Sequence, residues 1–182
     1  MNPNTPFRLE KLDPETYRHK TRASSLVLIV IFASLAMGCA SVFVLLWGQP
    51  GSNFRLNLLG VLTGLGLTLA LVKFYLSRQP FMREAVYSWR LKRQLMRITN
   101  IMHKITPLVE ADHTAALSAL CFYHRALEQM HYLEGNDVGA LELKVEKQQL
   151  IEKMQALGLE TEITTFDPQW LEQINAQASL KS

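Results

Sequence analysis

The chain has 182 residues, of which 48% are hydrophobic, and its 19 lysines and arginines slightly exceed its 16 aspartates and glutamates. The charge is unevenly distributed, because residues 1–104 carry a net charge of +10 and residues 105–182 a net charge of −7. Since the basic residues flank two apolar runs, we expect them to face lipid headgroups and not a nucleic acid. The two cysteines, Cys39 and Cys121, are 82 positions apart and indicate no disulfide framework.

The two apolar runs predict two membrane-spanning helices. The run 23–54 and the run 56–72 contain no Asp, Glu, Lys or Arg. A helix over about 24–47 is roughly 36 Å long, and a helix over about 56–76 is roughly 32 Å long. Both lengths exceed a hydrocarbon core of about 30 Å, so each helix is long enough to cross a bilayer.

A short outer loop, 48–55, connects the two predicted spans. Its glycines and proline favour a turn, which makes the two helices antiparallel neighbours. The sequence therefore predicts a transmembrane hairpin over 23–79, preceded by a cytoplasmic N-terminal arm over 1–22.

The basic residues around the hairpin predict its orientation. They precede the first span or follow the second, and only Arg55 lies in the connecting loop. Because cytoplasmic flanks of membrane proteins are enriched in Lys and Arg, we expect both termini in the cytoplasm. Long basic side chains at the inner ends of the spans are expected to contact headgroups, namely Arg22, Lys73, Arg78 and Arg83.

Small residues recur at four-residue spacing in both predicted spans. Ser34 and Gly38 form such a pair in the first span, and Gly60 and Gly64 form one in the second. This spacing lets helix backbones approach closely in lipid. Packing within the hairpin and homodimerisation both remain open. Neither span has a charged residue at its centre, which argues against an ion channel or a transporter.

Residues 80–182 are predicted to form a cytoplasmic helical domain. Its first helix carries an apolar seam, and Pro107 is expected to kink or end this helix near Ile105. The seam needs a partner helix from its own bundle or from another protein, and both alternatives remain open. It consists of Leu91, Leu95, Ile98, Met102, Ile105 and Val109.

Three further segments complete this domain. The helix predicted over 114–133 has an apolar face broad enough for a central, mostly buried helix of the bundle. A third helix is expected to end at Gly158. After an extended stretch, Asp167 and Pro168 predict the start of a last helix. The predicted fold class is all-α, with a two-helix transmembrane hairpin followed by a cytoplasmic bundle of three or four helices.

Two Glu-x-x-His motifs are candidates for metal chemistry, Glu110 with His113 and Glu128 with His131. Cys121 and His124 share a helical face with the second motif, so a single zinc site there, or a nucleophilic pair of Cys121 and His124, also remains open. On one continuous helix, about 27 Å would separate the motifs, so a shared site needs a break between them. The simpler interpretation is a polar flank of a surface helix. We expect no catalytic residues, no cofactor and no evident small-molecule substrate.

Three short motifs carry a family resemblance. They are Asp13-x-x-x-Tyr17-Arg18, the segment 53–61 (Asn-Phe-Arg-Leu-Asn-Leu-Leu-Gly-Val), and Trp89-x-Leu91-Lys92-x-x-Leu95. In these motifs the chain resembles a family of uncharacterised gammaproteobacterial inner-membrane proteins with a domain of unknown function, and the resemblance covers most of the chain. It implies a location in the bacterial inner membrane and supplies no catalytic residues.

These patterns favour a non-enzymatic membrane-anchored adaptor. Its expected partners are the lipid bilayer and either another protein or further copies of the chain. Two alternatives remain: a membrane-tethered metal-dependent enzyme that uses the Glu-x-x-His residues, and a regulator that binds an anionic lipid surface through the basic stretch 83–97.

Overall fold

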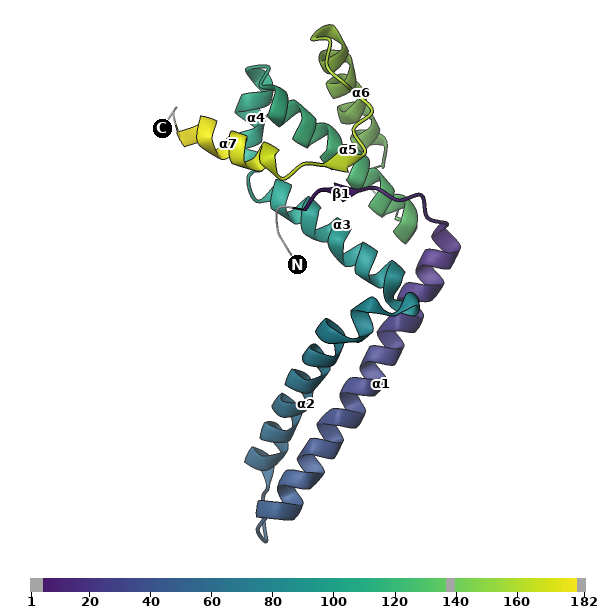
Figure 1. The fold of residues 1–182 in the computed structure, drawn as a ribbon, viewed down its shortest axis with the longest axis vertical. Helices are drawn as coiled ribbons and strands as arrows, with labels where there is room; N and C mark the ends of the chain where they lie inside the picture. The colour runs from purple at the N-terminus through teal and green to yellow at the C-terminus, as the bar shows by residue number, and fades with distance from the viewer. Residues whose placement is uncertain (1–4, 137–139, 180–182) are drawn as a thin grey trace. The chain divides into compact units, whose positions relative to one another are not determined.

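The computed structural model describes residues 5–136 and 140–179, and in this part of the chain it is mostly helical (Figure 1). The seven helices described are α1 (Pro14–Trp47), α2 (Phe54–Phe74), α3 (Arg83–Thr99), α4 (Met102–Glu110), α5 (Thr114–Glu134), α6 (Ala140–Ala156) and α7 (Gln169–Ser179). Two 3-10 turns, Leu76–Arg78 and Pro80–Met82, connect α2 to α3. The chain divides into a hairpin unit over Thr16–Val86 and a helical unit that joins residues up to Glu15 with those from Tyr87 onward.

In the hairpin unit, α1 and α2 pack against each other through small residues. A Cβ atom on Gly60 would lie 2.3 Å from the Cα of Ala40, and a Cβ atom on Gly64 would lie 2.5 Å from the Cα of Ala36. The two glycines therefore bring the helix backbones into direct contact. The polar Thr68 is buried beside them, and its hydroxyl donates a hydrogen bond to the carbonyl of Gly64 at 2.7 Å.

The other predicted pair of small residues lies elsewhere on α1. Ser34 and Gly38 are exposed, and no atom lies within 4 Å of the Cβ position of Gly38. Because successive residues of a helix are about 100° apart, Ala36 and Gly38 point about 160° apart, to nearly opposite sides of α1. The stripe that packs against α2 is Ala36 with Ala40.

Helix α1 begins at Pro14, well before the predicted span, and its first turns contact the turn before α3 and the first turn of α3. The Lys20 Nζ atom forms an ion pair with Glu84 Oε1 at 2.7 Å. The hydroxyl of Ser24 donates a hydrogen bond to the carbonyl of Phe81 at 2.8 Å, which satisfies this buried polar side chain.

In the helical unit, α5 is the central helix, as its predicted apolar face indicated. It packs against α4, α6 and α7, and its most deeply buried side chains include Leu117 and Phe122. Gly135 ends the helix in the left-handed conformation (φ 69°), where its missing Cβ avoids strain. Within the described residues of 80–182 there are five α-helices, α3 to α7, where the sequence predicted three or four.

A two-stranded antiparallel sheet also belongs to this unit, and the sequence analysis did not predict it. Strand β1 (Phe7–Arg8) pairs with β2 (Thr165–Phe166). The ring of Phe166 is fully buried, with its centroid 5.4 Å from that of Phe122 on α5. Residues 5–15 of the predicted N-terminal arm therefore belong to the helical unit, whereas the rest of the arm, from Thr16 onward, belongs to the hairpin unit.

The chain breaks between α3 and α4 at a different place from the one predicted. The break falls at residues 100–101, and Pro107 lies inside α4 instead of ending a helix. Proline removes one backbone donor, here the one that would pair with the carbonyl of His103. Pro107 and His103 are both exposed, so water can hydrate that carbonyl and the helix continues.

Candidate functional site

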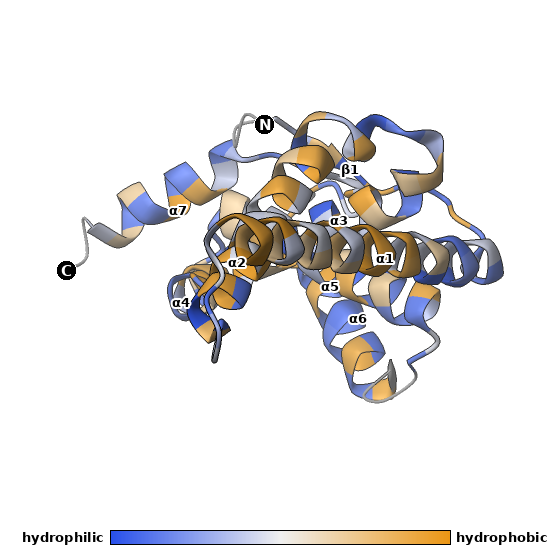
Figure 2. Ribbon diagram, turned by 90° about the horizontal axis from the view of Figure 1, so that it is seen from below, coloured by the Kyte–Doolittle hydropathy of each residue, from blue (hydrophilic) through white to orange (hydrophobic). Residues whose placement is uncertain are grey.

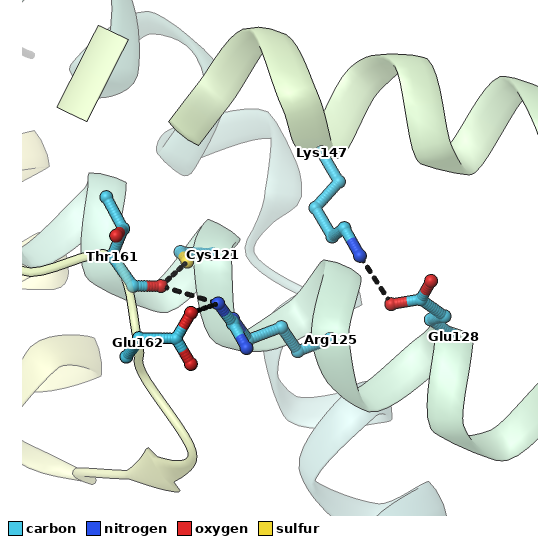
Figure 3. Close-up of polar contacts among 6 residues, drawn as sticks. All are labelled: Cys121, Arg125, Glu128, Lys147, Thr161 and Glu162. Atoms are coloured by element: carbon cyan, nitrogen blue, oxygen red, sulfur yellow. Dashed lines mark hydrogen bonds and ion pairs between the residues drawn. The ribbon is translucent and has the colours of Figure 1, made fainter. Parts of the chain in front are cut away.

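A cluster of polar side chains joins α5 to α6 and to the segment after α6 (Figure 3). The Arg125 Nη2 atom donates to the carbonyl of Thr161 and to Glu162 Oε1, both at 2.9 Å. On the next turn of α5, Glu128 Oε2 forms an ion pair with Lys147 Nζ of α6 at 2.6 Å. These contacts fix the extended stretch 159–166 and α6 to the central helix.

Cys121 lies in the same cluster, one turn before Arg125. Its thiol is fully buried and donates a weak hydrogen bond to the carbonyl of Thr161 at 3.5 Å. Burial raises the pKa of the Cys121 thiol, although the hydrogen bond with Arg125 opposes the increase. The thiol is therefore protonated at neutral pH, which disfavours a role as a nucleophile.

His124 is the one buried histidine among the described residues, with 6% of its surface exposed. Burial lowers the pKa of His124, against the opposing effect of Glu146, whose Oε2 atom lies 4.0 Å from His124 Nδ1. Nearby Lys147 lowers the pKa further. The imidazole is therefore neutral at pH 7 and acts as part of the core between α5 and α6.

Lowering the pH is expected to destabilise the chain through His124. Its folded pKa is below the 6.5 of an ordinary histidine, so the unfolded state binds a proton first as the pH falls. The stability from a neutral His124 is complete above pH 6.5 and is lost as the pH falls from 6.5 toward the folded pKa. Thermal unfolding between about pH 5 and pH 8 should show this slope, and His124→Gln should flatten it. The matched control is His103→Gln, at an exposed position on α4, which should keep the slope; an unchanged slope in His124→Gln would refute the prediction.

The structure does not gather the candidate metal ligands into one site. Glu110 is the last residue of α4 and His113 directly precedes α5, whereas His131 lies in the last turn of α5. About 27 Å of helix separates the two histidines. Glu128 is paired with Lys147, and no group of three or more His, Cys, Asp or Glu able to hold a metal ion occurs within residues 5–136 and 140–179.

The apolar seam of the predicted first helix lies mostly in the core of the chain. The structure divides it between α3 and α4, and four of its members are buried: Leu91, Leu95, Ile98 and Ile105. Met102 and Val109 are half-buried. A partner protein would have to open the fold to reach the buried part of the seam.

The predicted headgroup contacts are all solvent-exposed: Arg22, Lys73, Arg78 and Arg83. They belong to the hairpin unit, and Lys73 Nζ lies 5.3 Å from the ring centroid of Phe74. The sequence analysis missed the role of Arg125, because its partners Thr161 and Glu162 lie more than thirty residues away in a segment without a periodic pattern.

Comparison with known proteins places the chain in a family. A family model described as "Protein of unknown function (DUF3087)" matches residues 7–171, which include both long apolar helices and α3 to α6. No curated protein and no solved structure matches the chain. Because the family model covers most of the sequence, the chain belongs to DUF3087, a family of proteins of unknown function.

Proposed function

We propose that the chain is a membrane-anchored, non-enzymatic adaptor of the bacterial inner membrane. In this proposal α1 and α2 span the bilayer, and the helical unit is held at the cytoplasmic face, where it binds a protein partner or another copy of itself. The observation that carries the proposal is the outward-facing apolar surface of the hairpin.

This surface surrounds both long helices. Only 6% of the most apolar window of the first helix and 17% of that of the second are buried, with mean hydropathies of 2.6 and 1.8. Figure 2 shows hydrophobic residues along α1 and α2. Large exposed side chains include Leu26, Ile29, Val30, Met37, Leu45, Leu62 and Leu69. Soluble proteins rarely expose contiguous apolar patches of this extent, and a lipid environment removes the penalty.

The charges at the two ends of the hairpin support an orientation with both termini in the cytoplasm. The exposed Arg22, Lys73 and Arg78 lie at one end, whereas the other end carries only Arg55, in the first turn of α2. A cysteine at Ser52 tests this topology in a chain whose Cys39 and Cys121 are replaced by serine. A membrane-impermeant maleimide should label position 52 in intact cells from the periplasmic side, and labelling only after lysis would overturn the topology.

The helical unit has the properties of a rigid binding platform. Three ion pairs connect its elements, with N–O distances of 2.6–2.9 Å: Arg125–Glu162, Lys147–Glu128 and Lys153–Asp112. Residues 105–182, which contain α5 to α7, carry a net charge of −7. A fixed acidic surface favours a partner with a basic one.

In-cell crosslinking followed by affinity purification and mass spectrometry tests the adaptor function. The full chain is compared with a version that ends after Arg78 and keeps the hairpin. A defined protein enriched only with the full chain, or the chain itself in crosslinked oligomers, is the expected result. Identical recovery from both versions would overturn the adaptor proposal.

A further inference from the structure

Helix α3 has two distinct faces, and one of them is partly exposed in the described part of the chain. Its inner face is formed by Leu91, Leu95 and Ile98, all of which are buried. On the other side, 52% of Trp89 and 64% of Met96 are exposed. These two residues are seven positions apart, so they lie within about 20° of each other around the helix axis. Two large apolar side chains therefore form a ridge along the outer face of α3.

Basic residues flank this ridge. Arg93 lies one turn from Trp89, with its guanidinium carbon 5.2 Å from the centroid of the indole ring, and Arg90 is exposed beside it. Lys92 on the other flank is paired with Glu134 at 2.6 Å. The only carboxylate within α3 is that of Glu84, which is buried. The outer face of α3 thus combines exposed apolar side chains with the exposed arginines Arg90 and Arg93.

The position of α3 in the chain limits how far it can be from the bilayer. Helix α2 ends at Phe74, the 3-10 turn after it ends at Arg78, and α3 begins at Arg83. Five residues span at most about 18 Å even when fully extended. If the hairpin crosses the membrane, the start of α3 must lie at or near the headgroups of the cytoplasmic leaflet.

We propose that the outer face of α3 lies on the anionic phospholipid surface of that leaflet. Trp89 and Met96 enter the boundary between headgroups and acyl chains, and Arg90 and Arg93 contact lipid phosphates. A helix with an aromatic and aliphatic ridge between basic flanks is suited to this interfacial position. The inference rests on the proposed function, because α3 reaches the leaflet only when the hairpin spans it.

The test uses the full chain reconstituted in vesicles, with Trp89 as the only tryptophan. Trp47 and Trp170 are replaced by phenylalanine, and the vesicles contain phosphatidylglycerol and phosphatidylcholine with a shallow brominated-lipid quencher. Trp89 fluorescence is expected to be quenched and shifted to shorter wavelength. Pure phosphatidylcholine vesicles, or high salt, should remove most of the effect because the arginines then lose their electrostatic attraction.

Two matched variants separate the contribution of this face from that of total charge. Arg90→Gln with Arg93→Gln removes two charges from the face and should weaken docking by roughly 30-fold. Lys11→Gln with Lys144→Gln removes two charges from exposed positions outside α3 and should leave quenching unchanged. Equal quenching in both variants would overturn the role of the arginines and with it the inference.

A second variant, whose only tryptophan is Trp47, reports whether the hairpin that anchors the chain is inserted in the bilayer. It therefore distinguishes failure of the α3 inference from failure of the membrane anchor. Quenching of Trp47 without quenching of Trp89 would refute the docking of α3 and leave the anchor intact. No quenching of Trp47 would refute the anchor itself. If Trp89 is shielded from aqueous iodide without lipid quenching, a protein surface covers α3 and the lipid proposal is wrong.

Discussion

Replacing Gly64 with leucine is expected to separate α1 from α2 and to destabilise the hairpin by about 3 kcal/mol or more. A side chain at this position would meet the Cα of Ala36 at 2.5 Å and its backbone nitrogen at 2.6 Å. Backbone atoms cannot move away as the end of a flexible side chain can. The helices must therefore shift apart, and they lose the close contacts that stabilise helix pairs in lipid.

The matched control for this prediction is Gly66→Leu, on the same helix two residues later. No atom lies within 4 Å of its Cβ position, so the added side chain points into open space. Unfolding of the full chain in mixed micelles, followed by circular dichroism, should show a large loss of stability for Gly64→Leu and little change for Gly66→Leu. Equal stabilities would contradict the packing of α1 on α2 through Gly64.

The small-residue motif also shows how far the sequence could predict this packing. Four-residue spacing in the second span selects Gly60 and Gly64, and in the structure both glycines lie against the backbone of α1. On α1 the same spacing occurs twice, in Ser34 with Gly38 and in Ala36 with Ala40, and spacing alone does not choose between them. The choice depends on the rotation of α1 about its axis, which its nearly uniform apolar surface does not reveal.

The features that the sequence analysis missed depend on contacts between distant residues. Strands β1 and β2 have two residues each, too few for an alternating pattern, and they pair across more than 150 positions. In contrast, the end of α6 and the start of α7 could be predicted, because each depends on residues next to it in the sequence. Gly158 ends α6 with a positive φ of 69°, and the Asp167 carboxylate accepts a hydrogen bond from the backbone of Gln169 at 2.9 Å.

Replacing Ile98 of the apolar seam with alanine should destabilise the helical unit by about 2–5 kcal/mol. Ile98 is completely buried, so alanine removes apolar contacts and leaves a cavity in the core. Met96 lies two residues away on the same helix, and 64% of it is exposed. Met96→Ala should therefore change the free energy of unfolding by less than about 0.5 kcal/mol. Chemical denaturation of both variants measures the difference.

The same pair of variants decides which function the seam serves. If Leu95, Ile98 and their neighbours form the core, Ile98→Ala lowers the unfolding midpoint, and any loss of partner binding follows from loss of the fold. If the seam is instead a partner interface that opens in solution, Ile98→Ala would weaken binding and leave the unfolding midpoint unchanged. The burial of Ile98 favours the first result. An adaptor of this structure would then bind its partner through the outer surface of the helical unit, and substitutions there should reduce binding without lowering stability.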